Sequence, residues 1–198
     1  MDFMEAVAKR RSMYSISGES TIDVGRVRTI LESALLHTPS PYNIQHGRIV
    51  LLTGSHHLRL WDIVMEALRA RVAPERFGRT EVKVNSFKAG HATVLFFNDD
   101  EAVRELSDRF PKYAETFPIW AQHSQGMLQY VVWTALESEG LGASLQHYNP
   151  IIDDKVHSEW DIPSSWRLIA QMPFGKPTGP AGDKDFLPLE KRFKVFID

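Results

Sequence analysis

Hydrophobic residues recur at the spacing of an amphipathic helix in three parts of the chain. Val24, Val27, Leu31 and Leu35 lie on one helical face, and the proline-containing turn at residues 38–41 ends this pattern. A second set with the same spacing comprises Leu58, Trp61, Met65 and Leu68. A short opening helix is expected around Phe3, Ala6 and Val7. These segments predict helices that each bury one side.

Short runs rich in β-branched and aromatic residues predict buried strands between these helices. The runs cover residues 48–53, 92–98 and 166–172, and turn-forming residues bound each of them. Residues 71–90 are the most loop-like part of the chain, and a last strand is expected at 194–197. Helices and strands therefore interleave within one expected domain that spans residues 1–198.

The segment at residues 119–139 is too long for a strand and is apolar on nearly every side in its second half. A helix of this kind is either central in the fold or covered by a partner subunit. The stretch from about residue 175 to the end at 198 begins rich in glycine and proline and has few apolar anchors of its own. It is interpreted either as an arm that reaches another subunit or as a surface loop.

Composition excludes several classes of site. The 198 residues contain no cysteine, which excludes disulfides, thiolate metal sites and cysteine nucleophiles. The formal net charge of −2 provides no general attraction for nucleic acid. The start is acidic where a secretory signal is basic, and the most apolar run, residues 127–136, is too short to span a bilayer. A cytoplasmic protein without nucleic-acid or membrane partners is expected.

Four polar clusters are candidates for a binding site. The first is the cationic run Lys9-Arg10-Arg11-Ser12, which either binds phosphate or complements the dipole of the opening helix. The second is a rigid turn with two amides, a hydroxyl and a ring, suited to a flat heterocycle or only to turn formation: Pro39-Ser40-Pro41-Tyr42-Asn43-Ile44-Gln45-His46.

The third cluster is a glycine turn that leads into a strand with a polar end, Gln146-His147-Tyr148-Asn149. Its Gly140-x-Gly142 is not a dinucleotide fingerprint, because it follows a helix and Leu145 stands where a third glycine is needed. The fourth is Glu190-Lys191-Arg192-Phe193, either a solvated charge run or a second phosphate contact. The sequence contains no Gly-x-Ser-x-Gly nucleophile elbow, no Walker phosphate-binding loop and no His-Glu-x-x-His zinc-binding motif. The scattered histidines do not form a metal-ligand set.

Three of these clusters together resemble the FMN-dependent nitroreductase family, and more closely its short fatty-acid-repression-mutant-type branch, over about residues 3–195. The segments that carry the likeness are Arg10-Arg11-Ser12, Pro39-Ser40-Pro41-Tyr42-Asn43-x-Gln45 and Gly140-Leu141-Gly142-Ala143-Ser144-Leu145-Gln146-His147-Tyr148-Asn149-Pro150. The resemblance implies an α+β fold, with a central, mostly antiparallel sheet flanked by helices, in an intertwined homodimer with FMN at the interface. The helix at 119–139 would then be central in the dimer, and the C-terminal arm would embrace the partner.

The resemblance also implies roles for individual residues. Arg10, Ser12 and Arg192 would hold the FMN phosphate, with Arg11 nearby. The turn containing Ser40, Pro41, Tyr42, Asn43 and Gln45 would border the isoalloxazine from the other subunit, while Leu145, Gln146 and His147 would lie along the flavin. Larger members often carry Lys-x-Arg near the C-terminus, where this chain has Glu190-Lys191-Arg192, so the resemblance leaves Lys191 open as a phosphate ligand. They also often place an acidic residue and glycine beside N5, where this chain has Gln146-His147, so donor preference is not carried over.

The implied activity is reduction of nitroaromatic acceptors, with quinones as a further acceptor class, using NADH or NADPH in a ping-pong exchange through flavin N5. The flavin carries this chemistry, so the resemblance assigns no catalytic side chain. One alternative is a flavoprotein with a mainly regulatory or sensory role in lipid or redox response. Another is an FMN-free ligand-binding relative, which flavin absorbance would distinguish.

Overall fold

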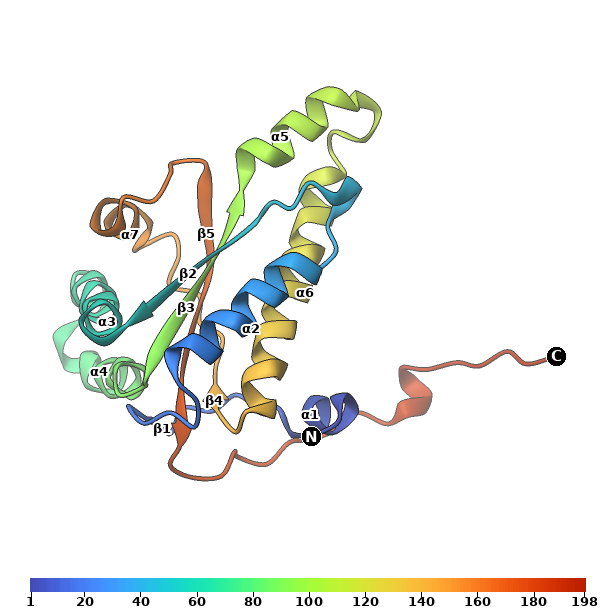
Figure 1. The fold of residues 1–198 in the computed structure, drawn as a ribbon. Coiled ribbons are helices and arrows are strands. Elements are labelled where there is room, and N and C mark those ends of the chain that lie inside the picture. Colours follow the sequence, from blue (N-terminus) through green and yellow to red (C-terminus); the bar gives the residue numbers. More distant parts are fainter.

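A computed structural model describes all 198 residues as a sheet between two layers of helices (Figure 1). The main strands are β2 (Gly47–Thr53), β3 (Ala92–Asp99) and β5 (Trp166–Pro177). Two short strands, β1 (Ile16–Ser17) and β4 (Gly142–Ala143), both pair with β5. The strand order is β1-β5-β3-β2, and all of these pairings are antiparallel. The predicted α+β architecture and its three main strands are confirmed.

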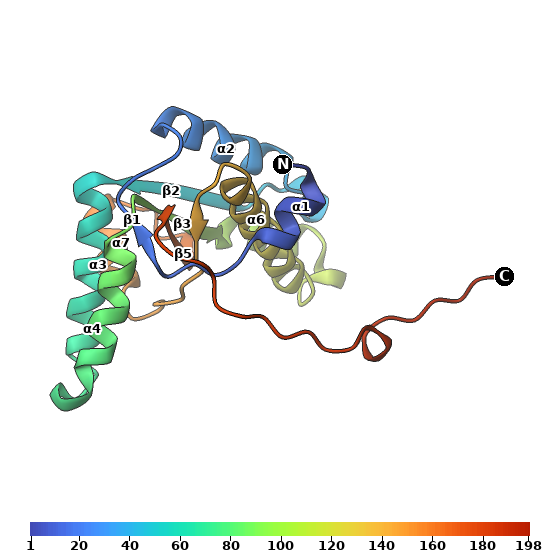
Figure 2. The ribbon, with the colours of Figure 1, turned by 90° about the horizontal axis from the view of Figure 1, so that it is seen from below.

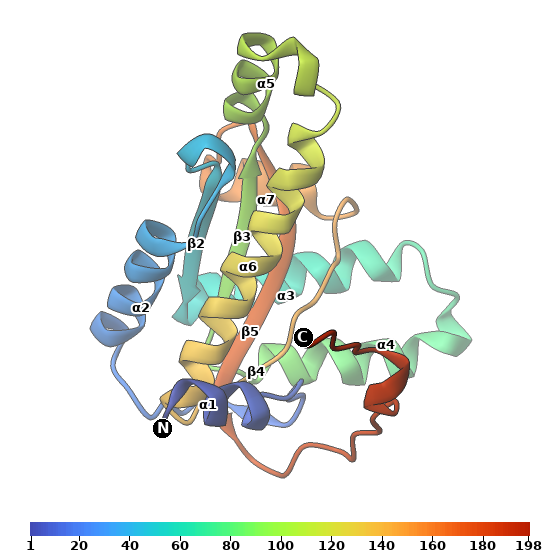
Figure 3. The ribbon, with the colours of Figure 1, turned by 90° about the vertical axis from the view of Figure 1, so that its right-hand side faces the viewer.

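The two helical layers follow from side-chain alternation along the strands. In β3, Val94 and Phe96 face one core while Leu95 and Phe97 face the other, because successive side chains point to opposite faces. On the first face lie α2 (Val24–His37) and α6 (Phe117–Ser138); on the second lie α3 (Gly54–Arg69), α4 (Pro74–Lys88) and α7 (Asp153–Trp160). The helix α1 (Phe3–Lys9) packs near the end of α6, and α5 (Asp100–Arg109) projects beyond the sheet (Figure 3).

The long helix α6 is buried on only one side in the isolated chain. Leu128, Val132 and Leu136 pack into the core between α6 and the sheet. On the opposite side, Met127 and Val131 keep 41% and 43% of their surface exposed. The helix ends at Ser138, and the left-handed backbone of Gly140 (φ 79°) then turns the chain toward β4. No helix of the chain is both long and apolar enough to cross a membrane.

Two sequence predictions are wrong. Residues 71–90 are not a loop: α4 occupies most of them and packs beside α3, with Val84 and Phe87 fully buried (Figure 2). Residues 194–197 form no strand, because the chain leaves the sheet after Pro177 and the arm has no neighbouring strand to pair with. Three residues of the arm, Leu189–Lys191, form a short 3-10 turn that projects away from the body (Figure 2).

Candidate functional site

The cationic cluster is fixed against the strand that precedes the predicted ligand-binding segment. Asp2 caps α1 by accepting the Glu5 N–H at 2.9 Å, and the helix ends at Lys9, with Arg10 as its C-cap. The chain then runs beside β4: Ser12 forms a bridge to Ala143, and the Met13 N–H donates to the Ala143 carbonyl at 2.9 Å. Arg10 and Ser12 are thereby brought to the same end of the fold as β4.

Arg10 is a partly buried cation without a carboxylate partner. Its guanidinium carbon lies 4.3 Å from the centre of the Trp133 ring and 5.9 Å from that of Tyr130. Its Nε atom is buried without a hydrogen-bond partner, and none of the ion pairs of the chain includes it. A guanidinium left in this state is suited to bind an anionic group such as a phosphate.

An acid, Glu137, lies one turn of α6 beyond Trp133 and feels the charge of Arg10. Burial raises the pKa of the Glu137 carboxyl, and the positive charges of Arg10 and Lys9 partly oppose this effect. Lys9 itself is engaged by Glu5 at 2.7 Å on the exposed side of α1. Arg10 is therefore the cation of this cluster that remains free for a ligand.

Arg11 turns toward the C-terminal arm. Its Nη2 atom donates to the carbonyl oxygens of Gly182 and Asp183, the latter at 3.1 Å. These contacts hold the start of the arm against the end of α1. Lys191 and Arg192 lie farther along the arm, at the end of the projecting 3-10 turn, which Figure 2 shows away from α1.

The segment Leu145-Gln146-His147 is held rigidly along β5. The backbone of Gln146 exchanges two hydrogen bonds with Gln171, at 2.7 and 2.9 Å, and its side-chain amide donates to Ser144 Oγ at 3.1 Å. Leu145 packs at the edge of the core, whereas His147 is exposed. The strand predicted here is short, since β4 covers only Gly142–Ala143 and an isolated bridge continues the pairing at Gln146.

An open cavity of about 320 Å³ adjoins His147. Its walls are mostly polar and come from α6, from the segment that follows β4 and from β5, whose Arg167 is paired with Asp100 at 2.8 Å. Carboxamide side chains supply much of this lining: Gln122, Gln125, Gln129 and Asn149. Such groups both donate and accept hydrogen bonds, so this cavity suits a neutral ligand with peripheral oxygen or nitrogen atoms.

The turn at residues 40–45 has an unusual backbone, and we refer to it as the 40–45 loop. Tyr42, Asn43 and Gln45 all have positive φ angles, between 50° and 55°, which non-glycine residues rarely adopt. Ser40 Oγ accepts the Gln45 N–H at 2.9 Å. Tyr42 is anchored by aromatic contacts with Phe110 and Phe117, at centroid distances of 4.9 and 5.6 Å. Residues held in such conformations cost on the order of 1–3 kcal/mol each and cluster at functional sites.

One chain does not bring the 40–45 loop to the cationic cluster. Pro41 and the loop lie beside the N-terminal part of α6, near Trp120 and Ser124, whereas Arg10 packs on Trp133 near the other end. A helix of 22 residues is about 33 Å long, so the two groups are far apart along it. The 40–45 loop and the cationic cluster therefore form two half-sites at opposite ends of α6, and His147 lies beside residues 122–129 of α6, between them.

Two neighbours of these half-sites escaped the sequence reasoning. The ring of Trp133 packs against the Arg10 guanidinium. Trp133 follows Tyr130 by one turn on a helix with apolar residues on nearly every side, and this aromatic pair is the sequence signal for the contact. Thr38 and Gln125 each have a buried polar atom without a hydrogen-bond partner beneath the 40–45 loop, and no spacing in the sequence identifies these two residues. No group of three or more histidine, aspartate or glutamate side chains is arranged to hold a metal ion.

Comparisons of the sequence and of the structure with known proteins agree on one family. The model of the Nitroreductase family matches residues 7–176. The nitroreductase FRM2 of Saccharomyces cerevisiae is 33% identical over 188 residues, which cover 94% of this chain and 93% of the yeast protein.

Solved structures agree with this match. The nitroreductase CinD of Lactococcus lactis, determined with chloramphenicol and with 4-nitrophenol, superposes with a TM-score of 0.90 and 38% identity over 99% of this chain and 100% of CinD. A Desulfovibrio desulfuricans protein in complex with FMN has a TM-score of 0.71 at 18% identity, covers 100% of this chain and 99% of its own, and shares the fold. The chain belongs to the nitroreductase family.

Proposed function

We propose that this protein is an FMN-dependent NAD(P)H oxidoreductase that reduces nitroaromatic acceptors, with quinones as a further acceptor class, and that it works as a homodimer. The observation that carries the proposal is the position of Arg10, an unpaired and partly buried cation, two residues before the bridge between Ser12 and Ala143, from which the chain runs on into the rigid segment 145–147. A phosphate-bearing planar cofactor needs both features: charge-assisted donors for its phosphate and a fixed edge for its ring.

The residues present fit FMN. Arg10 and Ser12 would hold the phosphate, joined by Arg192 when the arm is in place, and the backbone of residues 145–147 would border the ring. The chemistry that FMN supplies when bound is two-electron transfer through N5, in which NAD(P)⁺ leaves before the acceptor enters. The task of the protein is then to orient the ring and to stabilise negative charge near it with fixed donors.

A homodimer would complete the site from its two half-sites. Two copies related by a two-fold axis, with their α6 helices antiparallel, would bring the 40–45 loop of one chain toward Arg10 of the other. The uncovered face of α6 supports this arrangement, since it borders an open groove of about 470 Å³ lined by Ile30, Met127 and Val131. The arm supports it as well, because its exposed apolar side chains lack cover in a single chain: Phe186, Leu187, Leu189, Phe193 and Phe196.

The acceptor class rests on the relatives and on the open cavity. CinD was determined with 4-nitrophenol and with chloramphenicol. In the present chain, the carboxamide-lined cavity beside His147 could hydrogen-bond the oxygen atoms of a nitro group or a quinone. The next residue, Tyr148, does not line this cavity: its ring packs against Trp61 in the core on the other face of the sheet, at a centroid distance of 6.0 Å, and burial raises its pKa to about 12.

An anaerobic absorption experiment tests the proposal. The purified protein should show oxidised-flavin bands that bleach with NADH or NADPH and return when a nitroaromatic is added. A protein that stays colourless after reconstitution with FMN would refute the enzyme function. Slow oxidation of NAD(P)H with every acceptor, together with a tight protein or lipid partner, would instead favour the regulatory flavoprotein.

A further inference from the structure

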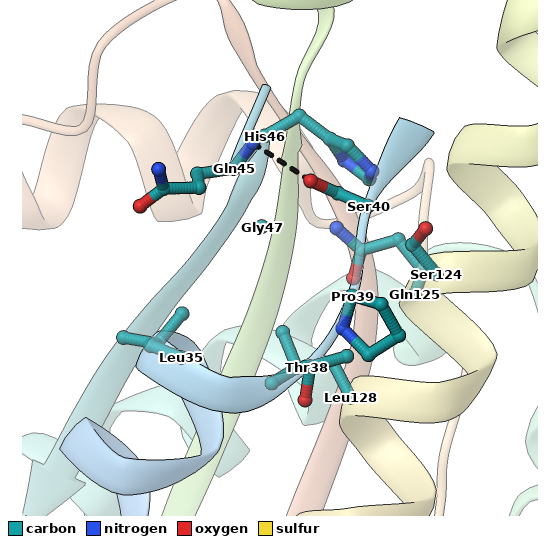
Figure 4. Close-up of a pocket in the computed structure, with 10 residues that line it drawn as sticks. All are labelled: Leu35, Thr38, Pro39, Ser40, Gln45, His46, Gly47, Ser124, Gln125 and Leu128. Carbon is teal, nitrogen blue, oxygen red and sulfur yellow. Dashed lines mark hydrogen bonds between the residues drawn. The ribbon is translucent and has the colours of Figure 1, made fainter. Parts of the chain in front are cut away.

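A small polar cavity lies beneath the 40–45 loop. It has a volume of about 30 Å³ and lies between the end of α2, the start of β2 and the middle of α6 (Figure 4). Leu35, Pro39 and Leu128 form its apolar walls. A space of this size holds one or two water molecules and excludes any organic ligand.

The cavity concentrates polar atoms that have no partner in the chain. Ten buried side-chain nitrogen or oxygen atoms lack a hydrogen bond, and four of them belong to residues that line this one cavity. These four are Thr38 Oγ1, Gln125 Oε1 and both ring nitrogens of His46, one of which lies near the side chain of Asn98 and leaves the other for a ligand. Because an unsatisfied buried polar group costs about 1–3 kcal/mol, so many at one place indicate a ligand that serves them together.

The chemistry of these atoms limits the ligand to a small neutral molecule. Gln125 has a fixed orientation, since its Nε2 donates to the Phe97 carbonyl at 2.8 Å and its Oε1 can only accept. Burial lowers the pKa of His46, so the ring is neutral and offers one donor and one acceptor. Thr38 can do either. No carboxylate, lysine or arginine lines the cavity, so neither a cation nor an anion would find a counter-charge.

We infer that this cavity is an internal water site, in which a water molecule bonded to Thr38, His46 and Gln125 fastens the base of the 40–45 loop to α6. A water molecule has two donors and two acceptors, which match a bare carbonyl oxygen, a neutral imidazole and a hydroxyl. Thr38 is the C-cap of α2, His46 directly precedes β2 and Gln125 lies in α6, so the water joins three elements directly below the loop.

The site explains how the loop keeps its unfavourable backbone. Above, the loop is held by the ring contacts of Tyr42 and by the bond from the Gln45 N–H to Ser40 Oγ. Below, the bridged water would fix both chain ends, at Thr38 and at His46. Three residues with a left-handed backbone keep this conformation only where several surrounding contacts hold them in it. The inference concerns the chain itself and holds whether or not the protein binds a flavin.

A high-resolution crystal structure of the full chain tests the site directly. The expected result is a solvent peak within hydrogen-bond distance of a His46 ring nitrogen and of Thr38 Oγ1 or Gln125 Oε1. The inference is overturned if the cavity contains no density and the three side chains hydrogen-bond to one another instead.

A matched pair of substitutions gives an independent thermodynamic test. Thr38→Val removes the hydroxyl but keeps the shape, and the extended backbone of Thr38 (φ −75°, ψ 124°) suits valine. If a water bonds this hydroxyl, the melting temperature falls by about 2–4 °C. Thr134→Val is the control, because Thr134 Oγ1 is also buried and unpartnered but does not line the cavity. Loss of the Thr134 hydroxyl should leave the melting temperature of the protein unchanged or raise it.

The loop supplies a local readout. In Thr38→Val, hydrogen exchange at the Gln45 amide should accelerate about tenfold, while exchange in Thr134→Val should match the parent protein. The same melting temperature for both variants, with unchanged exchange at Gln45, would show that no water bridges this site.

Discussion

The guanidinium of Arg10 stacks on the ring of Trp133, with its central carbon 4.3 Å from the ring centre. An aromatic face attracts a cation without neutralising it, so the charge remains available to a ligand. A carboxylate partner would also have held the side chain, but it would have competed with a phosphate for the same donors. Trp133 is thus a positioning residue for the proposed phosphate contact.

We predict that Trp133→Leu weakens FMN binding about tenfold while affecting riboflavin much less. Tenfold corresponds to about 1.4 kcal/mol, within the range of a partly desolvated cation–π contact. Riboflavin lacks the phosphate, so it reports on the rest of the site. Quenching of flavin fluorescence during titration measures both affinities. Trp133→Phe is the control and should retain most of the FMN affinity; equal weakening of FMN and riboflavin in Trp133→Leu would contradict the positioning role.

A second prediction addresses the phosphate contact itself. The double variant Arg10→Ala/Arg192→Ala should purify largely colourless, because the phosphate would lose much of its charge-assisted binding. The flavin-to-protein absorbance ratio measures this directly. Arg28→Ala/Arg104→Ala removes the same charge from exposed sites on α2 and α5 and should stay yellow. Full flavin content in the first variant would exclude Arg10 and Arg192 as the phosphate ligands.

The helices that cover the sheet can be predicted from the sequence because their apolar stripes are dense. Val27 and Leu31 are followed by a proline-containing turn, and α2 ends where that turn begins. The helix α4 has a sparse stripe, in which Phe77, Val84 and Phe87 stand among many charges. Its stability comes from packing on α3, a tertiary effect that local periodicity does not record. The same limit made residues 71–90 look like a loop.

The candidate site divides in a similar way. Motif residues such as Arg10 and Gln146 are recognisable because their residue types and order are specific. The residues that contact them cannot be recognised in this way. The contact of Arg10 with Trp133 depends on how α1 crosses α6, and the contact of Arg11 with Gly182 depends on where the arm leaves β5. The absence of a strand at 194–197 has the same origin, since a strand exists only beside a partner.

A third prediction concerns stability against pH. His57 is buried, with Nδ1 2.8 Å from Thr93 Oγ1 and Nε2 3.1 Å from the Lys88 carbonyl oxygen. Burial lowers the pKa of His57, and burial also lowers that of His46. Because both histidines are protonated more easily when unfolded, their stabilising effect is complete above about pH 6.5 and declines as the pH falls below this value.

The measurement is urea unfolding between pH 5 and pH 8. Each histidine can contribute a slope of at most about 1.4 kcal/mol per pH unit below pH 6.5. His57→Gln should be less stable than the parent at pH 7 because its fit to Thr93 and Lys88 is disturbed, but its stability should depend less on pH. A slope in His57→Gln as steep as that of the parent would show that other groups set the acid sensitivity.

A fourth prediction tests whether the uncovered face of α6 joins two copies. Val131→Glu places a charge at the centre of this face, and burying it against a partner would cost several kcal/mol. The variant should be monomeric by light scattering and should lose flavin, because each half-site would lack the 40–45 loop of its partner. Val82→Glu makes the same change on the exposed face of α4, where Val82 is 72% exposed, and should remain dimeric and yellow. A monomeric parent with full flavin content would refute the shared site, whereas a monomeric Val131→Glu that keeps its flavin would show that one chain binds the cofactor alone.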